Sequence, residues 1–155
     1  MKGNAAVIAH LNDLLAAELT SVDQYFVHSR MYEDWGLTKL YERIGHEMQD
    51  ELGHADKLIK RILFLEGTPQ VGKRDPLRIG KDVPEMLAND LATEMDVAAH
   101  LKKVIAACEQ AQDYQTREIL EELLADTEED HAHWLEKQLN LINMVGLANY
   151  LQSQM

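Results

Sequence analysis

The sequence predicts an all-α protein: a four-helix bundle with one long crossover connection and a short fifth helix at its C-terminus. Apolar residues recur at spacings of three and four along most of the chain. That is the period of an amphipathic helix, and no stretch alternates as a strand would. The 155 residues include only three prolines and eight glycines, so helix breaks are few and most of them fall together. We expect one domain over residues 1–155.

The break signals divide the chain into five helices, expected over residues 5–34, 38–66, 84–111, 114–145 and 147–152. Trp35-Gly36 ends the first pattern, and Gly67-Thr68-Pro69 is a typical stop for the second. Asp82 precedes the third helix and is a candidate N-cap.

The lengths of the connections predict the topology. Helices of about 30 residues are about 45 Å long, and the two short links make each pair of helices antiparallel. Residues 67–83 form the remaining connection, and a chain of that length reaches at most about 55–60 Å. It can therefore span the bundle and leave the second and third helices parallel, which is the arrangement with one long crossover.

Composition limits the partners and the compartment. Fifteen Lys and Arg against 27 Asp and Glu give a net charge of −12, which disfavours nucleic acid and favours cations. Cys108 is the only cysteine, so neither an intrachain disulfide nor a cysteine-rich metal site is expected. His10, Asn12 and Asp13 interrupt the first apolar stretch, which argues against a signal peptide or a membrane span. We expect a cytoplasmic protein with no membrane partner.

Each long helix carries a glutamate in the middle of its apolar stripe: Glu18, Glu51, Glu94 and Glu128. A buried, unpaired carboxylate is costly, and four that converge would repel one another. His54 and His131 each follow one of these glutamates by three residues, a spacing that puts both side chains on one helix face. A bound cation is therefore a better explanation than protonation.

The pattern repeats, because each expected hairpin supplies one lone Glu and one Glu-x-x-His. Two hairpins packed face to face would present four carboxylates and two imidazoles, a ligand set that suits two divalent ions. Iron or manganese fits such ligands better than calcium, and zinc could bind without redox chemistry. A misjudged helix face would explain one such glutamate, but not four with both histidines on the matching helices.

These residues resemble the bacterioferritin family along essentially the whole chain. The resemblance is carried by Gln24-Tyr25-Phe26, His28-Ser29-Arg30-Met31, Asp34-Trp35-Gly36, Glu51-x-x-His54-Ala55-Asp56, Arg61-Ile62-Leu63-Phe64-Leu65-Glu66-Gly67, Glu128-Glu129-x-His131, Trp134-Leu135-Glu136 and Gly146-Leu147-x-Asn149-Tyr150-Leu151-Gln152-Ser153. It implies a ferritin-like four-helix bundle with a di-iron ferroxidase centre.

The resemblance also implies roles for the six residues, as catalytic and metal-binding groups. Glu51 and Glu128 would bridge two irons. Glu18 and His54 would be terminal ligands of one iron, and Glu94 and His131 of the other.

Further site residues follow from the same resemblance. His46 and Asp50 match an iron site on an inner cavity wall, although two solvated polar residues would look the same. Glu47 lies one turn before Glu51 and could support the centre, bind a third iron transiently or face the cavity. Tyr25 and Trp134 resemble aromatics beside the centre, as electron donors or as packing.

Haem b is not expected on this subunit. The family ligates haem through a methionine directly after the glutamate of the first Glu-x-x-His, and this chain has Leu52 there, which offers no lone pair. Met48 lies one turn earlier, displaced by about 6 Å. The chain therefore resembles the haem-lacking subunit type.

The implied function is iron storage, with Fe²⁺ oxidised by O₂ or H₂O₂ and kept as mineral in a hollow shell of 24 subunits. The shell would be a homopolymer or a heteropolymer with a haem-binding bacterioferritin subunit. The alternatives are a di-iron peroxidase of rubrerythrin type, a DNA-protecting mini-ferritin and a passive shell subunit. The remaining histidines and the cysteine are expected to be surface or structural: His10, His28, His100, His133 and Cys108.

Overall fold

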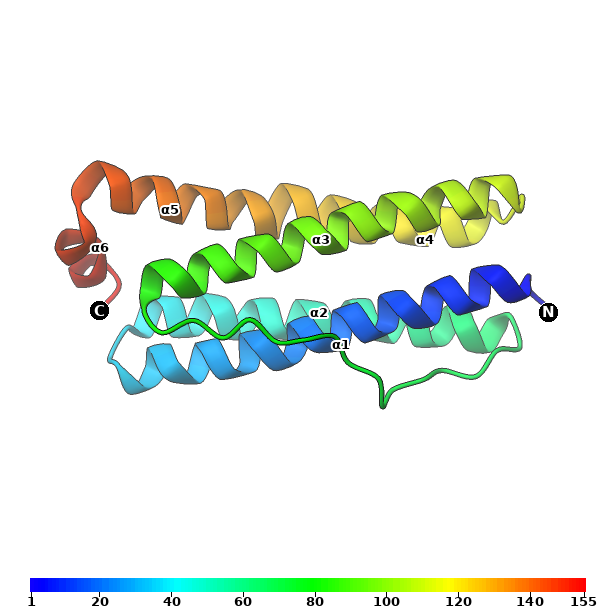
Figure 1. Cartoon of the computed structure of the whole chain (residues 1–155), viewed down its shortest axis with the longest axis horizontal. Coiled ribbons are helices and arrows are strands. Elements are labelled where there is room, and N and C mark those ends of the chain that lie inside the picture. The colour runs from blue at the N-terminus through cyan, green and yellow to red at the C-terminus, as the bar shows by residue number, and fades with distance from the viewer.

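A computed structural model describes all residues, 1–155. The helices are α1 (Ala5–Asp34), α2 (Thr38–Phe64), α3 (Val83–Gln110), α4 (Tyr114–Ala125), η1 (Asp126–Ala132), α5 (His133–Val145) and α6 (Leu147–Ser153). Figure 1 shows α1 antiparallel to α2, and α3 antiparallel to the continuous rod formed by α4, η1 and α5. The connection after α2 runs along the bundle, so α2 and α3 are parallel. The predicted all-α fold with one long crossover is confirmed.

Local capping explains where the helices begin. Asn4 accepts hydrogen bonds from the backbone N–H groups of Ala6 and Val7 at the start of α1. Asp82 caps α3 through the N–H of Glu85 at 2.9 Å, as the sequence predicts. A side-chain oxygen at this position satisfies an amide that has no partner inside the helix. Helix α2 ends at Phe64, two residues before its expected end, because Glu66 takes a positive φ of 63° that no helix can continue.

The apolar core falls into two clusters with a polar layer between them. The larger cluster packs around Leu11, Leu58 and Leu101 near the N-terminus, and Cys108 lies in it as a buried free thiol. The smaller cluster packs around Tyr32, Leu40 and other residues near α6. The mid-helix glutamates of α1, α2 and α3 lie between the two clusters in sequence, so the bundle holds its charged side chains where no apolar core is continuous.

Helix α1 is long and apolar enough, by length and composition, to cross a membrane. However, 61% of its most apolar window is buried inside the bundle, where α1 packs mainly against α2. Packing in the core accounts for its apolar character.

A buried polar network fixes the crossover to the bundle. Nε2 of His28 accepts the backbone N–H of Gly80 at 3.1 Å, so Nδ1 donates to Asp90 on α3 at 2.8 Å. Gln24 donates to the same carboxylate at 2.8 Å and accepts the N–H of Arg78. Burial raises the pKa of Asp90. The structural role expected of His28 is supported by these contacts.

The rod formed by α4, η1 and α5 differs from the prediction in one feature. The sequence predicts a regular helix over 114–145, but residues 126–132 form a π-helical segment between two α-helices. A π-helix bonds i to i+5 and widens the turn, and such segments occur mainly as short insertions at functional sites. The segment changes which side chains of this rod face the polar layer.

We expect His28→Ala to destabilise the fold by about 3–5 kcal/mol, because it strands the fully buried carboxyl of Asp90 and frees the crossover. Urea unfolding of the metal-free protein measures this loss. His133→Ala is the matched control, since that side chain is largely exposed and its removal should stay within about 0.5 kcal/mol. Equal effects of the two substitutions would contradict a role for His28 in holding the crossover.

Candidate metal centre

Three helices place a glutamate in the polar layer at mid-bundle. Glu18, Glu51 and Glu94 come from α1, α2 and α3, and each is at most 1% exposed. They point inward because they occupy positions on the apolar stripes of their helices, flanked on the same face by core residues such as Leu14 and Leu58. The helix faces predicted for these glutamates are therefore correct.

Glu51 is shared between two groups of possible metal ligands. Its Oε2 lies 3.3 Å from Nδ1 of His54, and its Oε1 lies 3.0 Å from Nδ1 of His131. Glu18 Oε2 lies 3.4 Å from His54 Nδ1, and Glu94 Oε1 lies 3.3 Å from His131 Nδ1. In each group, one ligand atom from every residue lies within 4.8 Å of the others.

Burial and repulsion between charges raise the pKa of two carboxyl groups in this layer, Glu18 and Glu94. Burial raises the pKa of Glu18 well above its usual range, and the charge of Glu51 raises it further. Burial likewise raises the pKa of Glu94. For His54, burial alone would lower the pKa, but the carboxylates of Glu18 and Glu51 raise it to about 11. Burial thus favours the protonated form of Glu18 and Glu94, and the carboxylates beside His54 favour its protonated imidazole.

The donors fit two divalent cations. Each group offers two carboxylates and one imidazole nitrogen, the ligand types preferred by iron, manganese and zinc. Both oxygens of Glu18 and Nδ1 of His54 are buried without a hydrogen-bond partner. Buried polar atoms without partners are rare and costly, and a cation between them would satisfy both residues.

The structure does not bring Glu128 into this layer. Its side chain is 41% exposed, and its carboxylate pairs with Lys102 Nζ of α3 at 3.1 Å. The sequence interpretation relied on Glu128 and His131 sharing a face of an α-helix, but both residues lie in the π-helical segment η1. There the turn is wider, so a spacing of three no longer guarantees a common face.

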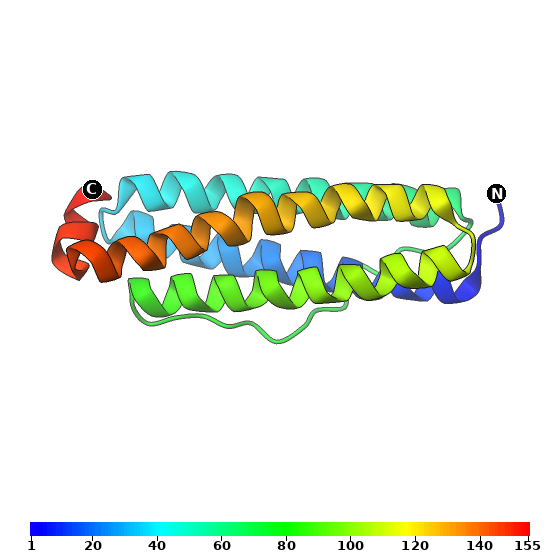
Figure 2. The same cartoon turned by 90° about the horizontal axis from the view of Figure 1, so that it is seen from above.

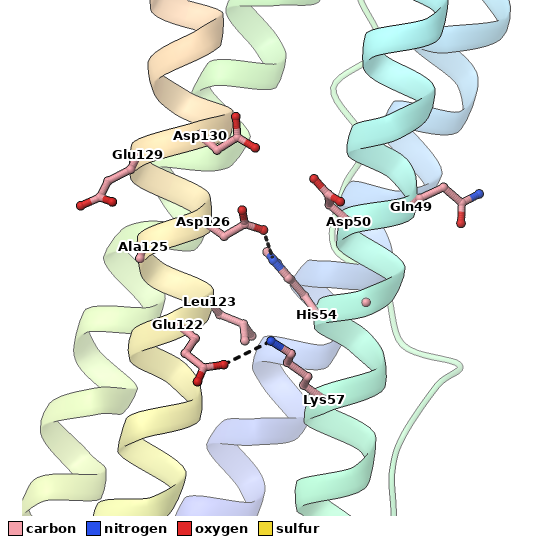
Figure 3. Close-up of a pocket in the computed structure, with 11 residues that line it drawn as sticks. Gln49, Asp50, His54, Lys57, Glu122, Leu123, Ala125, Asp126, Glu129 and Asp130 are labelled. Carbon is pink, nitrogen blue, oxygen red and sulfur yellow. Dashed lines mark hydrogen bonds and ion pairs between the residues drawn. The ribbon is translucent and has the colours of Figure 1, made fainter.

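Asp126 lies next to His54, and the sequence analysis did not identify it as a site residue. Its Oδ2 lies 2.6 Å from Nε2 of His54 and 3.8 Å from Nε2 of His131, and Figure 3 shows it reaching across from the rod to α2. Residues five apart in an α-helix point about 140° away from each other. The wide turn of η1 lets Asp126 approach the imidazoles. The apolar pattern of the sequence does not predict that turn.

A second acidic group surrounds the outer nitrogen of His131. Glu47 Oε2 lies 2.5 Å and Asp50 Oδ2 lies 3.1 Å from its Nε2, and Asp130 completes the group. Arg43 bonds both Glu47 and Asp130, at 2.5 and 2.8 Å, and balances part of their charge. Asp50, expected on an inner iron site, therefore lies in this group together with Glu47, and His46 is not part of it.

The aromatic residues and His46 lie at the edges of the site. Tyr25 is buried and its hydroxyl donates a hydrogen bond to Glu94. The Trp134 ring lies under the guanidinium of Arg43, 4.8 Å from the ring centroid. His46 is mostly exposed, 3.5 Å from Asp50.

A pocket of about 730 Å³ opens beside the centre and reaches its edge at His54. It lies between α2 and the rod of α4 and η1, and His54 and Asp126 form part of its wall (Figure 3). Asp50, Glu129 and Asp130 add carboxylates to its lining. A small cation can therefore approach the imidazole of His54 through an acidic opening.

Comparison with known proteins identifies the family. A family model described as a ferritin-like domain matches residues 8–145. The bacterial ferritin of Synechocystis is 64% identical over 155 residues, which cover 100% of this chain and 99% of that protein. The chain belongs to the bacterial ferritin family. The bacterial ferritin of Pseudomonas aeruginosa is 59% identical over 99% of both chains, and the bacterioferritin of Brucella melitensis is 45% identical over 98% of this chain and 94% of its own.

Bacterial ferritin membership confirms the family resemblance and the ferritin-like bundle. Leu52, which stands where the family resemblance implies a haem-binding methionine, is exposed on α2. Met48 is 8% exposed and packs within the apolar cluster near α6, so its side chain already has core contacts.

We expect metal binding to release protons. His54 holds a proton at neutral pH in the metal-free chain, because its pKa is about 11 against an ordinary 6.5, and a cation at Nδ1 must displace it. The affinity for Zn²⁺ should therefore rise between about pH 6 and 9, about tenfold per pH unit for each proton displaced. Calorimetry in buffers of different ionisation enthalpy counts those protons. An affinity independent of pH would show that the imidazoles are already neutral.

Proposed function

We propose that this protein stores iron and oxidises Fe²⁺ at the centre built around Glu51. The observation that carries the proposal is the position of that carboxylate, with one oxygen facing each of two ligand groups. Relatives named bacterial ferritin or bacterioferritin, alike over the whole chain, support iron storage.

The geometry suits a pair of Fe²⁺ substrate ions. Glu18 and His54 would hold one ion and Glu94 and His131 the other, with Glu51 between them. Two Fe²⁺ together give up two electrons, enough to reduce one O₂ to H₂O₂ or one H₂O₂ to water. The chain's part is to bind both ions, keep them adjacent and take up or release protons at its carboxylates and imidazoles.

Glu128 enters this proposal as a sixth ligand that has to change its side-chain position. In the structure it is bonded to Lys102, and an exposed pair of this kind contributes only about 0–1 kcal/mol. Binding of a cation can offset so small a loss. Glu128 would then join Glu51 between the two ions.

Storage requires an enclosed space that one bundle does not have. We propose a cytoplasmic shell of 24 chains, built from this subunit alone or together with a haem-binding subunit, with this chain carrying no haem b. The Asp50 and His46 pair beside the acidic pocket would take iron from the centre toward the mineral. The negative charge of −12 would draw Fe²⁺ to the shell.

Stopped-flow mixing of the metal-free protein with Fe²⁺ in air tests the oxidation. We expect a fast phase that consumes about two irons per chain, since each of the two ligand groups holds one ion. Glu51→Ala and Glu128→Ala should each abolish the fast phase, because each removes a ligand between the ions. Glu121→Ala, an exposed change on the same rod, should leave it intact.

The absence of a fast phase in the native chain would contradict ferroxidase activity. Slow mineral formation in that case would favour a passive shell subunit. Consumption of H₂O₂ without retention of iron would favour a di-iron peroxidase. Sedimentation velocity of the same samples measures whether the chains assemble into a particle of shell size.

A further inference from the structure

The carboxylate of Asp126 is bonded to a buried imidazole that faces the metal centre. Its Oδ2 lies 2.6 Å from Nε2 of His54, while Nδ1 of the same ring points toward Glu18 and Glu51. His54 is only 5% exposed, so its ring cannot exchange this contact freely for water. Asp126 and the glutamates thus lie on opposite edges of one ring.

The orientation of this ring decides whether the centre has a nitrogen ligand. A neutral imidazole has one N–H and one lone pair, and the hydrogen bond made by one nitrogen fixes the role of the other. When a cation displaces the second proton, a neutral ring that donates Nε2–H to a carboxylate presents the lone pair of Nδ1 on its other edge. Such outer carboxylates orient metal-binding histidines and strengthen their ligation.

His131 shows the same arrangement with different residues. Its Nδ1 faces Glu51 and Glu94, and its Nε2 faces Glu47 and Asp50 of α2. The two rings are stacked with their centroids 5.9 Å apart and their planes 15° apart. Each imidazole therefore has an outer carboxylate from the helix opposite its own: α2 supplies those of His131, and η1 supplies that of His54.

The π-helical segment is what supplies that partner. Asp126 is the first residue of η1, and the widened turn carries both it and His131 toward α2. In a regular α-helix these two residues would diverge by about 140°. The π-helical turn therefore brings a carboxylate to His54.

We propose that Asp126 is a positioning residue of the metal centre: it accepts a hydrogen bond from Nε2–H of His54 and so directs Nδ1 toward the ion held by Glu18 and Glu51. It touches neither the ion nor the oxidant. The inference rests on the proposed function for the identity of the ion as Fe²⁺, whereas the geometry applies to any divalent cation at this position.

The test uses redox-inert metals, so that it does not depend on iron oxidation. Zn²⁺ affinity is measured by chelator competition, and Co²⁺ absorption bands report the ligand field. Asp126→Ala removes the acceptor and should lower Zn²⁺ affinity at one of two sites by about 10–100-fold, with altered Co²⁺ bands. Asp126→Asn keeps an acceptor oxygen without the charge and should restore most of the affinity and the native bands.

Glu129→Gln is the matched control. Glu129 lies in the same segment and lines the same pocket, and its substitution removes one charge without a contact to His54. It should leave Zn²⁺ affinity and Co²⁺ bands unchanged. Thermal melting of each metal-free variant checks the fold, and Asp126→Ser replaces the alanine variant if that one melts early.

Equal losses in Asp126→Asn, Asp126→Ala and Glu129→Gln would overturn the proposal, because they would show that Asp126 acts by its charge alone. Native affinity and native Co²⁺ bands in Asp126→Ala would overturn it as well. Failure of the proposed function is recognised separately: the unaltered chain would then show no fast phase of Fe²⁺ oxidation, whatever the Zn²⁺ affinities of the Asp126 variants.

Discussion

The constraint on which the structure depends is the burial of several carboxylates at one level of a helical bundle. Glu18, Glu51 and Glu94 are almost fully removed from water, and each would destabilise the fold if it were charged and alone. Two imidazoles lie among them and offset part of that cost in the metal-free chain. A layer of this kind is conditionally stable: protons or cations must occupy it, and the apolar clusters on both sides must hold it closed.

Two well-packed apolar clusters lie on either side of this layer, and an irregular helical segment, η1, lies beside it. Large apolar side chains such as Leu11 and Tyr32 fill the two clusters without contacting water, and the network of His28 and Asp90 fixes the crossover to the bundle. The only break in helical regularity along the last rod coincides with the site. The π-helical segment presents Asp126 and His131 to the metal centre.

The site combines protection with access. Its inner ligands are buried, yet the Nε2 edges of His54 and His131 face an acidic group at the wall of an open pocket. A cation arriving from solvent meets carboxylates that remain hydrated before it meets those that are not. Because hydrated carboxylates bind and release cations at low cost while buried ones need neutralisation, the arrangement favours transfer inward.

The sequence by itself determined the helices, the crossover and three of the four glutamate positions, because an α-helix of period 3.6 fixes which residues share a face. It also determined that His54 and His131 lie with Glu51, since both come from stripes that the apolar pattern defines. Only the tertiary structure decided the positions of Asp126 and Glu128. Both lie in the π-helical segment, where i to i+5 bonding turns successive side chains through smaller angles than an α-helix does. A face argument made at α-helical spacing therefore included Glu128 and left out Asp126.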